Sequence, residues 1–466
     1  MTHAYLGLAA FDVAATALGY AILYGLGVVR TRLAALRSVA FAFLTGLVTF
    51  GVGLTTVLSL DIGLNWVTIA VFSIVVVGVS LGIRRRFPAI AAAPIADQRA
   101  NPLTRLLVVG GIAVLVLALA SAFVAAFNAN ADSSYDLWIN WIVKGKAIYY
   151  FHHLSTGLSG VTRYAHFNYP LFVPTLIATE FHWMGGDHPV LLPLQQSIIL
   201  IAFFAAVASL LARHVPRFVI YPWLAMLIVA PGFWLRAIYV LPDLTMAYFV
   251  ALAAIAGILW IEEQRTAWLI LATLFIAAAT LTKNEGLSLG GLLALALAAA
   301  AIAMHGRRGL QSLVLFIGVA AIEPWHLWLT SHGRSTATAE YDWHEAFHPH
   351  YLSEKFWRFK YALLSMERWI FAGDVWLLVP PLVLAALVIV AVSRPALALA
   401  VAGWLVAAFF GIGFVFWIGR PDVGWYVGYA AFRIMTTLPI IACTAIPLLL
   451  GIAISQQRAR KRESAP

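Results

Sequence analysis

The chain has 466 residues, of which 62% are hydrophobic and only 11% are charged. Soluble globular proteins carry about 25% charged residues, so this composition excludes that class and predicts a protein that crosses a membrane many times. The net charge of +10 does not indicate nucleic-acid binding, because most Lys and Arg residues lie in short links between apolar runs, as the positive-inside rule requires.

Apolar runs that are long enough to cross a membrane recur along the whole chain. A spanning helix needs roughly 20 apolar residues, and we count about thirteen such runs. They lie near residues 5–29, 38–58, 64–83, 105–127, 189–212, 217–235, 243–261, 266–282, 286–304, 310–330, 374–392, 396–418 and 432–454. The sequence therefore predicts an all-α polytopic membrane protein with about thirteen transmembrane helices.

Basic residues in alternate links predict how these helices are oriented. The basic links contain Arg30, Arg84, Arg213, Arg307 and Arg458. All of them can be cytoplasmic at once, which places the N-terminus outside and the C-terminus inside. The two long links left outside, residues 129–188 and 331–373, hold many of the acids, histidines and tryptophans. Because loops on a rigid scaffold often carry function, we predict an active face toward the periplasm or cell exterior of the cytoplasmic membrane.

The chain divides into two parts. Residues 1–104 contain three apolar runs and a loose cytoplasmic link, and they look like an addition ahead of the main body. Residues 105–466 contain the other runs and both long outer loops, and we predict that they form the main transmembrane domain.

The first long outer loop contains an amphipathic segment. If residues 135–153 form a helix, Asp136, Asn140 and Lys144 recur every four residues and form one polar stripe, with Trp141 on the opposite side. This division suits a helix at the membrane surface, with its aromatic rings at the headgroup level and its charges above them. A solvated interfacial helix without chemistry is the plain alternative.

Four features occur in a fixed order along the main body. They are Asp136 in YDLWINWIVKGKA, the segment HFNYPLFVPTL from His166 to Leu176, Asp243 in YVLPDLTMAYF, and the junction from Thr282 to Gly286. In these features the chain, from about residue 105 to its C-terminus, resembles the polytopic glycosyltransferases of the GT-C class. That class includes the protein O-mannosyltransferases and the aminoarabinose transferase of lipid A. The first three runs precede the point where those better-known members begin.

This resemblance implies a GT-C-like core and a specific type of reaction. A sugar carried on a polyprenyl phosphate would pass, with inversion, to a hydroxyl of a glycan, lipid or protein acceptor at the outer membrane surface. Membrane lipids would surround the enzyme. The resemblance implies no required cofactor, and a divalent metal ion is compatible with it.

Two acids are the candidates for catalysis. An acceptor hydroxyl is a poor nucleophile, and a carboxylate in a partly desolvated loop can serve as its base. Asp136 is our first choice because it matches the first-loop acid of the family; the alternatives are pairing with Lys144 or capping the loop helix. Asp243 follows Pro242 at the start of a span. It either orients sugar or acceptor hydroxyls or compensates the helix dipole.

Three basic residues are candidates for binding the donor phosphate. The leaving lipid phosphate gains negative charge, which Lys or Arg can stabilise. Lys283 is favoured, since it lies at headgroup height on the predicted active face, although it could simply pair with Glu285. Arg236 and Arg433 are alternatives, and each could instead be an interfacial anchor.

Five further residues are predicted to contact substrate. They are Asp132, Lys144, Tyr169, Glu285 and Glu323. Asp132 could equally be a helix N-cap. Glu323 lies within an apolar run, before Pro324, and would either face the substrate cavity or form a hydrogen bond inside the bundle.

Histidines of the second long loop do not predict a metal site. His344 and His348 would share one face of a helix, as metal ligands do. However, Pro349 would end that helix, and the HExxH pattern is absent. A polar outer loop rich in aromatic rings is the favoured interpretation.

Three other functions remain open at this point. A secondary transporter or lipid flippase would place ionisable groups near the bilayer midplane and often shows matching halves, whereas here the acids favour one face. An oligosaccharide ligase or polymerase would concentrate its chemistry in the loop from Ser331 to Asp374. A scaffold without chemistry would not explain the gathering of Asp, Lys, His and Trp in two loops.

Overall fold

The computed structural model of the chain describes residues 1–90, 101–129, 136–154, 166–237, 242–337, 341 and 343–463. Within these ranges every regular element is a helix, and the β contact is an isolated bridge between Tyr341 and Gly419. The protein is therefore all-α, and its long apolar helices are those of a polytopic membrane protein.

The helices follow one another along the chain with short connections. The first are α1 (Thr2–Gly25), α2 (Arg32–Arg37), α3 (Val39–Ser59), α4 (Trp66–Ile83), α5 (Pro102–Asn128), η2 (Leu137–Ile142), α6 (Val143–Phe151), α8 (Phe172–Met184), η3 (Pro189–Leu191), α9 (Leu192–Leu211), α10 (Arg217–Val229) and α11 (Pro231–Ala237). The middle group is α12 (Pro242–Glu263), α13 (Thr266–Thr282), α14 (Asn284–His305), η4 (Gly306–Val314), α15 (Leu315–Val319), η5 (Ala320–Ile322) and α16 (Glu323–Ser331). The last are α17 (Pro349–Glu354), α18 (Phe356–Phe371), α19 (Gly373–Trp376), α20 (Val379–Ser393), α21 (Pro395–Ile418), α22 (Val423–Tyr426), η6 (Val427–Ala431), α23 (Phe432–Met435) and α24 (Thr437–Glu463).

The number of membrane spans differs from the sequence prediction. Among the described residues, nine helical segments are long and apolar enough to cross a membrane, or ten if α10 and α11, which meet at 71°, form one broken span. Helices α13 and α20 have 17 and 15 residues, which is shorter than the roughly 20 residues of a typical span. The predicted runs 286–304 and 310–330 fall in one apolar stretch, Asn284–Ser331. Every predicted run coincides with helix, but thirteen separate spans are not established.

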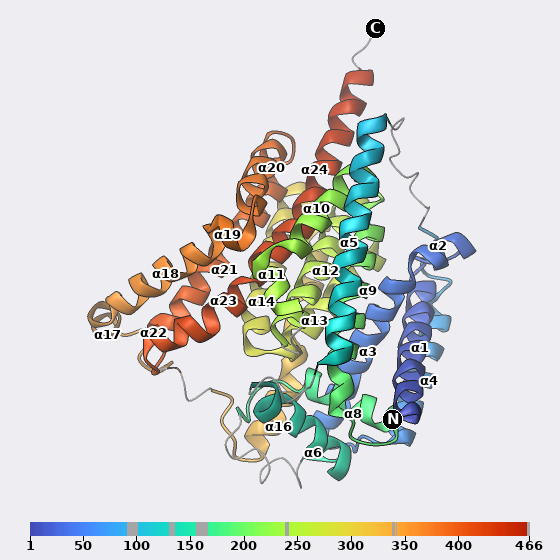
Figure 1. Cartoon of the computed structure of the whole chain (residues 1–466), viewed down its shortest axis with the longest axis vertical. Coiled ribbons are helices and arrows are strands. Elements are labelled where there is room, and N and C mark those ends of the chain that lie inside the picture. Colours follow the sequence, from blue (N-terminus) through green and yellow to red (C-terminus); the bar gives the residue numbers. More distant parts are fainter. Residues whose placement is uncertain are drawn as a thin grey trace.

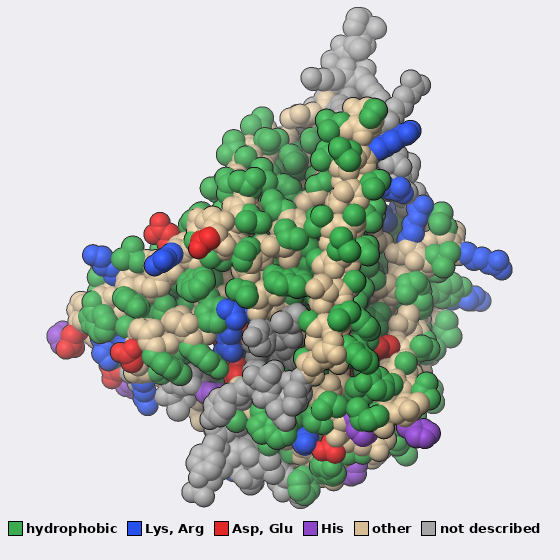
Figure 2. Space-filling view, in the orientation of Figure 1, with side chains coloured by type: hydrophobic (Ala, Val, Ile, Leu, Met, Phe, Trp, Pro, Cys, Tyr) green, Lys and Arg blue, Asp and Glu red, His purple; other side chains and the backbone are tan. Residues whose placement is uncertain are grey.

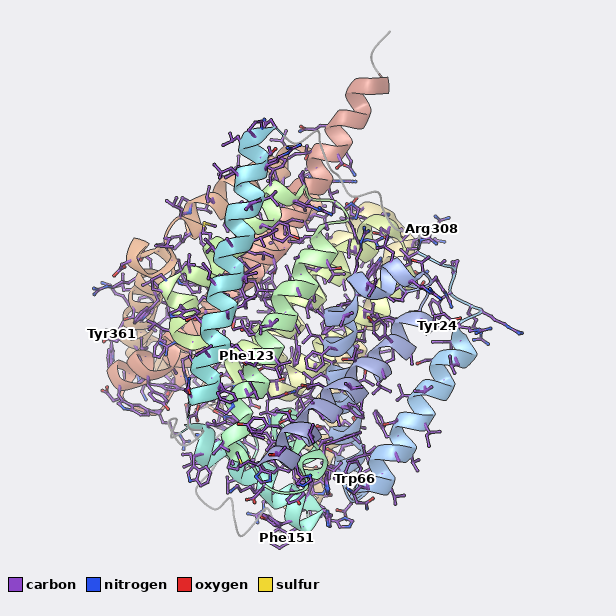
Figure 3. The ribbon with its side chains drawn as sticks, turned by 45° about the vertical axis from the view of Figure 1, so that its right-hand side comes forward. Tyr24, Trp66, Phe123, Phe151, Arg308 and Tyr361 are labelled. Carbon is purple, nitrogen blue, oxygen red and sulfur yellow. The ribbon has the colours of Figure 1, made fainter. Side chains whose placement is uncertain are left out.

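The bundle has two distinct ends. Figure 1 shows α6, α8 and α16 at one end, which we call the loop end, and α2 and the C-terminus toward the other. In Figure 3, Trp66 and Phe151 lie at the loop end, whereas Tyr24 and Arg308 lie near the opposite end, which we call the basic end. Figure 2 shows hydrophobic side chains over most of the surface between them, with Lys and Arg gathered at the upper right and histidines at the lower right. Links that alternate along the sequence thus lie at opposite ends, as the positive-inside pattern requires.

Helix α12 is the centre of the bundle. Its apolar window is completely buried, and it packs against α13, α14 and α24. The segment ALAAIAGILW is apolar on every side, and a helix of this kind is stable only when it is enclosed by other helices. Asp243 lies in the first turn of α12, at the loop end, while Glu262 and Glu263 lie at its other terminus. The central helix therefore carries carboxylates at both ends of the bundle.

The N-terminal helices pack closely against one another and against the main body. A Cβ atom on Gly19 of α1 would lie 1.8 Å from the carbonyl oxygen of Ala42, and one on Gly46 of α3 would lie 1.7 Å from that of Ala15. These glycines let the two backbones touch, the usual way in which membrane helices associate. Helix α1 also packs on α8, and α3 on α8 and α9, so the N-terminal helices share one hydrophobic core with the main body.

The predicted amphipathic helix of the first outer loop is present, but its polar stripe faces inward. It consists of η2 and α6 and ends at His152, which has a left-handed conformation. Asn140 is 2% exposed and Lys144 is 0% exposed, whereas Trp138 is 42% exposed. The expectation of charges turned toward water is therefore wrong for this helix. The polar groups are turned toward partners on other elements, which an isolated helix pattern does not reveal.

Candidate functional site

An ion pair joins the first outer loop to the last helical run. Asp136 Oδ2 lies 2.8 Å from Arg433 Nη1, and the two side chains are 16% and 10% exposed. One turn further on, Asn140 donates from Nδ2 to Asp136 Oδ1 at 2.6 Å, and Asn140 Oδ1 accepts the backbone N–H of His166 at 3.2 Å. Both carboxylate oxygens of Asp136 are thus held, and its ionic partner is Arg433 rather than Lys144.

A second ionic group lies where α12, α13 and α14 meet. Lys283 Nζ is 2.9 Å from Asp243 Oδ1 and 3.0 Å from Glu285 Oε1, and both Lys283 and Asp243 are 4% exposed. Asp243 and Glu285 occupy the first turns of α12 and α14, where an acid is stabilised by the helix dipole. Burial alone would lower the pKa of Lys283, but the two carboxylates outweigh it and hold this pKa above its ordinary value. Lys283 is therefore charged at neutral pH.

The two ionic groups are neighbours. Arg433 interacts electrostatically with Asp243 as well as with Asp136, and it also influences Lys283. Asp136, Asp243, Lys283, Glu285 and Arg433 therefore form one assembly, which we call the charged cluster. Within the described part of the chain, three of its buried atoms have no hydrogen-bond partner: Asp243 Oδ2, Glu285 Oε2 and Arg433 Nε. Because buried polar atoms are normally satisfied, these atoms are suited to bind polar groups of a ligand.

Three tyrosines border the charged cluster. The hydroxyls of Tyr341 and Tyr426 are hydrogen-bonded to each other, and the Tyr429 ring centre lies 4.7 Å from Arg433 Cζ. Burial, the neighbouring Tyr426 and the negative charge of Glu285 together raise the pKa of Tyr341. Its hydroxyl stays protonated at neutral pH and can donate a hydrogen bond.

Both partners of the Asp136 to Arg433 ion pair adjoin a π-helix. The π-helix η2 (Leu137–Ile142) begins directly after Asp136, and the π-helix η6 (Val427–Ala431) ends two residues before Arg433. A π-helical turn inserts an extra residue, which is tolerated mainly where it aims side chains at a functional site. The local geometry thus serves the placement of these two side chains.

Lys144 and Tyr169 belong to the same end of the molecule. Lys144 donates to the backbone carbonyl of His166, and burial lowers its pKa to about 7. The ring of Tyr169 stacks on that of His166 with centroids 4.6 Å apart, and its centre is 5.8 Å from Lys144 Nζ. Tyr169 also interacts electrostatically with Tyr341, so the predicted substrate residues Lys144 and Tyr169 lie beside the charged cluster.

The other predicted residues are placed less uniformly. The guanidinium carbon of Arg236 lies 3.6 Å from the ring centre of Phe432, next to Arg433, so Arg236 is at the edge of the cluster. Glu323 has a side chain that is 61% exposed, and its Oε1 lies 3.8 Å from His326 Nδ1. It therefore neither faces a cavity nor bonds inside the bundle, because the start of α16 presents it at the surface. Asp132 lies outside the described residues.

Potential metal ligands are not assembled in the described ranges. No group of three or more His, Cys, Asp or Glu side chains is placed there to hold a metal ion. The rings of His344 and His348 do lie on one side, with centroids 5.9 Å apart, but the side chain of His344 is 92% exposed.

An apolar groove begins close to the charged cluster. It has a volume of about 310 Å³ and is lined by α18, α20, α21 and α24, with Phe371, Val383, Phe409 and Leu438 among its walls. Leu438 follows Arg433 by five residues. Phe432 contacts Trp369, the neighbour of groove residue Ile370, with ring centroids 5.6 Å apart. The α18 and α24 walls thus lead from the groove toward Arg433.

Several residues of this site were not found from the sequence. Asn140 was placed on the polar stripe, but its bridge between Asp136 and His166 was not foreseen. Tyr426, Tyr429 and Arg433 follow an i, i+3, i+7 spacing, which could have indicated one helical face directed at a site. Tyr341 carried no such signal, since it lies in a loop and meets Tyr426 only in the folded chain.

Comparison of the chain with protein-family models, with curated proteins and with solved structures finds no match in any of the three. Its function is therefore inferred from the residues and their geometry.

Proposed function

We propose that this protein is an inverting glycosyltransferase that moves a sugar from a polyprenyl-phosphate donor to a hydroxyl of a glycan, lipid or protein acceptor. The charged cluster is the observation that carries this proposal. It combines a carboxylate that can act as a base, Asp136, with an arginine that can hold a phosphate, Arg433, at a distance of 2.8 Å. A GT-C-like core is part of the same proposal.

Arg433 is the preferred ligand for the donor phosphate. Lys283, the first choice from the sequence, is already neutralised by two carboxylates at 2.9 and 3.0 Å. Arg433 has a single close carboxylate partner in the described structure, and its Nε is unpartnered. A planar guanidinium binds phosphate oxygens in pairs. An arriving phosphate would compete with Asp136 for Arg433, and this exchange would release the carboxylate to act as a base only when donor is bound.

The proposed reaction is a single displacement. The acceptor oxygen forms a bond with the anomeric carbon while the bond from that carbon to the phosphate oxygen breaks. The hydroxyl proton passes to Asp136, and the electron pair leaves with the lipid phosphate, whose developing charge Arg433 stabilises. Asp243, fixed by Lys283, would accept hydrogen bonds from sugar or acceptor hydroxyls through its free Oδ2. Arg236, Tyr169 and Glu285 would contact the substrates at the edge of the cluster.

The apolar groove would receive the lipid of the donor. Its lining, from Phe371 on α18 to Leu438 on α24, is hydrocarbon and aromatic. Burial of each CH₂ group of a polyprenyl chain there would contribute roughly 0.8 kcal/mol. The position of the groove beside Phe432 would leave the phosphate within reach of Arg433.

We also propose that the loop end faces the periplasm or the cell exterior of the cytoplasmic membrane. The support is the distribution of Arg and Lys, which favours the cytoplasmic side for the opposite end. Reporter fusions after Lys144 and after Lys355 should both report an outside location, and an inside location for either would contradict this orientation.

Sugar transfer by the purified protein tests the function. Synthetic polyprenyl-phosphate sugars would be incubated with a cell-envelope extract as acceptor, and release of free polyprenyl phosphate would be measured. We expect turnover by the wild-type protein and a loss of about 10²- to 10⁴-fold in Asp136→Asn, the usual range for removal of a general base. Glu354→Gln, an exposed acid on α17, serves as the control and should retain full turnover. Full turnover in Asp136→Asn would remove the catalytic assignment.

A secondary transporter or lipid flippase is the alternative. One observation favours it: two acids, Asp12 and Glu180, lie within the bundle rather than at its ends. Proteoliposomes that contain a fluorescent polyprenyl phosphate separate the two functions. A transferase leaves the lipid in its leaflet and releases sugar, whereas a flippase moves the lipid between leaflets without cleavage.

A further inference from the structure

Two acidic side chains lie inside the bundle and outside the charged cluster. Asp12 is near the middle of α1, and Glu180, on α8, is 3% exposed. The two helices are in backbone contact, because a Cβ atom on Gly7 would lie 2.1 Å from the carbonyl oxygen of Trp183. This packing brings Asp12 and Glu180 close enough to interact electrostatically.

Neither carboxyl group has a basic partner in the described ranges. Asp12 Oδ1 accepts a hydrogen bond from Gln195 Nε2 at 2.9 Å. No ion pair or hydrogen bond of the Glu180 carboxyl is found among the described residues, and the charge that acts on it is that of Asp12. His182, two residues further along α8, instead packs against Tyr149, with ring centroids 4.9 Å apart. Two ionised carboxylates in such surroundings repel each other and lose their hydration, so they require a positive partner.

An unsatisfied amide oxygen belongs to the same group. Gln195, on α9, is 3% exposed, and its Oε1 has no hydrogen-bond partner among the described residues. Its Nε2 is committed to Asp12, which fixes the amide beside the carboxyl group. A buried carbonyl oxygen without a partner is unfavourable by itself, so this atom indicates a missing ligand that accepts electron density from oxygen.

We propose that Asp12, Glu180 and Gln195 form a binding site for a hard cation inside the helical bundle. Carboxylate and amide oxygens are the ligands that hard cations prefer. A cation would satisfy the amide oxygen and neutralise the carboxylates at once. It would also hold α1 onto α8 and α9, which gives the N-terminal helices a role independent of sugar transfer.

The surface near this group offers an approach for an ion from water. An open pocket of about 480 Å³ at the loop end is lined by Asn65, Trp66, Tyr149, His152 and His182, among others. His182 lies on α8 just beyond Glu180. An ion can therefore reach α8 from the aqueous side without crossing the apolar face of the bundle.

Thermal unfolding of the full-length protein in detergent tests this site. After treatment with a chelator, the unfolding midpoint would be measured at about pH 8, where free carboxyl groups are ionised. Sodium, magnesium and calcium chloride would each be compared with choline chloride at equal ionic strength. We expect one of these cations to raise the midpoint by roughly 2–5 °C at saturation. A sodium response would identify a monovalent site, and a magnesium or calcium response would identify a divalent one.

Isosteric variants locate the response. Asp12→Asn and Glu180→Gln should lose the cation-dependent rise, whereas the surface control Glu354→Gln should keep it. If either of the two acid variants fails to fold, Gln195→Met removes only the amide oxygen, and saturable binding of the radioactive cation to the purified protein replaces the unfolding measurement. The proposal is overturned if no cation acts differently from choline. It is equally overturned if lowering the pH alone raises the midpoint, since the two carboxyl groups would then share a proton and bind no metal ion.

Discussion

The two ends of α12 carry ionic groups that differ in burial and in completeness. At the basic end, Glu263 accepts hydrogen bonds from Arg213 at 3.0 Å and from Trp268 Nε1 at 2.9 Å, and both ionic side chains are close to 18% exposed. At the loop end, Asp243 and Lys283 are each 4% exposed, and Asp243 Oδ2 has no partner in the described structure. A pair at the rim can tie helices together without deep burial.

The difference indicates different purposes for the two groups. Deep burial of charge is unfavourable unless it is compensated, and a purely structural contact does not need it. The loop end also has both π-helices and the apolar groove beside Arg433. We therefore assign the basic end to stability and the loop end to chemistry, a division that substitutions at each end can test.

The largest loss of stability should follow from Lys283→Met. This change leaves Asp243 and Glu285 buried without their shared cation, and breaking such a buried pair costs about 3–5 kcal/mol. Thermal unfolding followed by tryptophan fluorescence measures it. The triple variant with Asp243→Asn and Glu285→Gln should recover part of the loss, because no uncompensated charge remains. A midpoint unchanged by Lys283→Met would show that water reaches this group freely.

A smaller loss should follow from Glu263→Gln at the basic end. The change weakens charge-assisted hydrogen bonds from Arg213 that are worth about 1.5–3 kcal/mol, in a partly exposed setting. Transfer activity per folded molecule should stay at the wild-type level. A fall in activity comparable with that of Asp136→Asn would contradict the division between the two ends.

The smallest effect should be a change in how stability depends on pH. The pKa of Lys144 is lowered to about 7, whereas an exposed lysine has a pKa of about 10.4. Between these values the unfolded chain binds more protons than the folded one, so the contribution of Lys144 to stability rises with pH across this window. Lys144→Met should therefore stabilise the protein at pH 6 by on the order of 1 kcal/mol more than at pH 9. An equal effect at both pH values would show that Lys144 keeps an ordinary pKa.

The sequence predicted the helices well but not the faces they bury. Each apolar run forms helix, because run length alone determines that outcome in a membrane. However, α12 is apolar on all sides, and such a helix has no periodicity from which its neighbours could be inferred. The exposed position of Glu323 and the inward position of Lys144 were mispredicted for this reason, since both depend on the packing of other helices.

Only part of the candidate site could be predicted. Asp136, Asp243 and Lys283 were selected individually from their positions at helix termini on one face of the membrane. Their assembly was not predictable, because Asp136 and Arg433 are separated by 297 positions along the chain. The π-helical turns that aim these two side chains have no sequence signature that we could recognise.

Affinity for polyprenyl phosphate tests the central claim most directly. Binding of a short-chain polyprenyl phosphate to the purified protein would be measured for the wild type, for Arg433→Gln and for Arg213→Gln, its counterpart at the basic end. Loss of a charge-assisted hydrogen bond worth about 1.5–3 kcal/mol should weaken binding by roughly 10- to 150-fold in Arg433→Gln, and Arg213→Gln should bind as the wild type does. Equal affinities in all three proteins would contradict the assignment of the loop end as the site of a lipid-phosphate transferase.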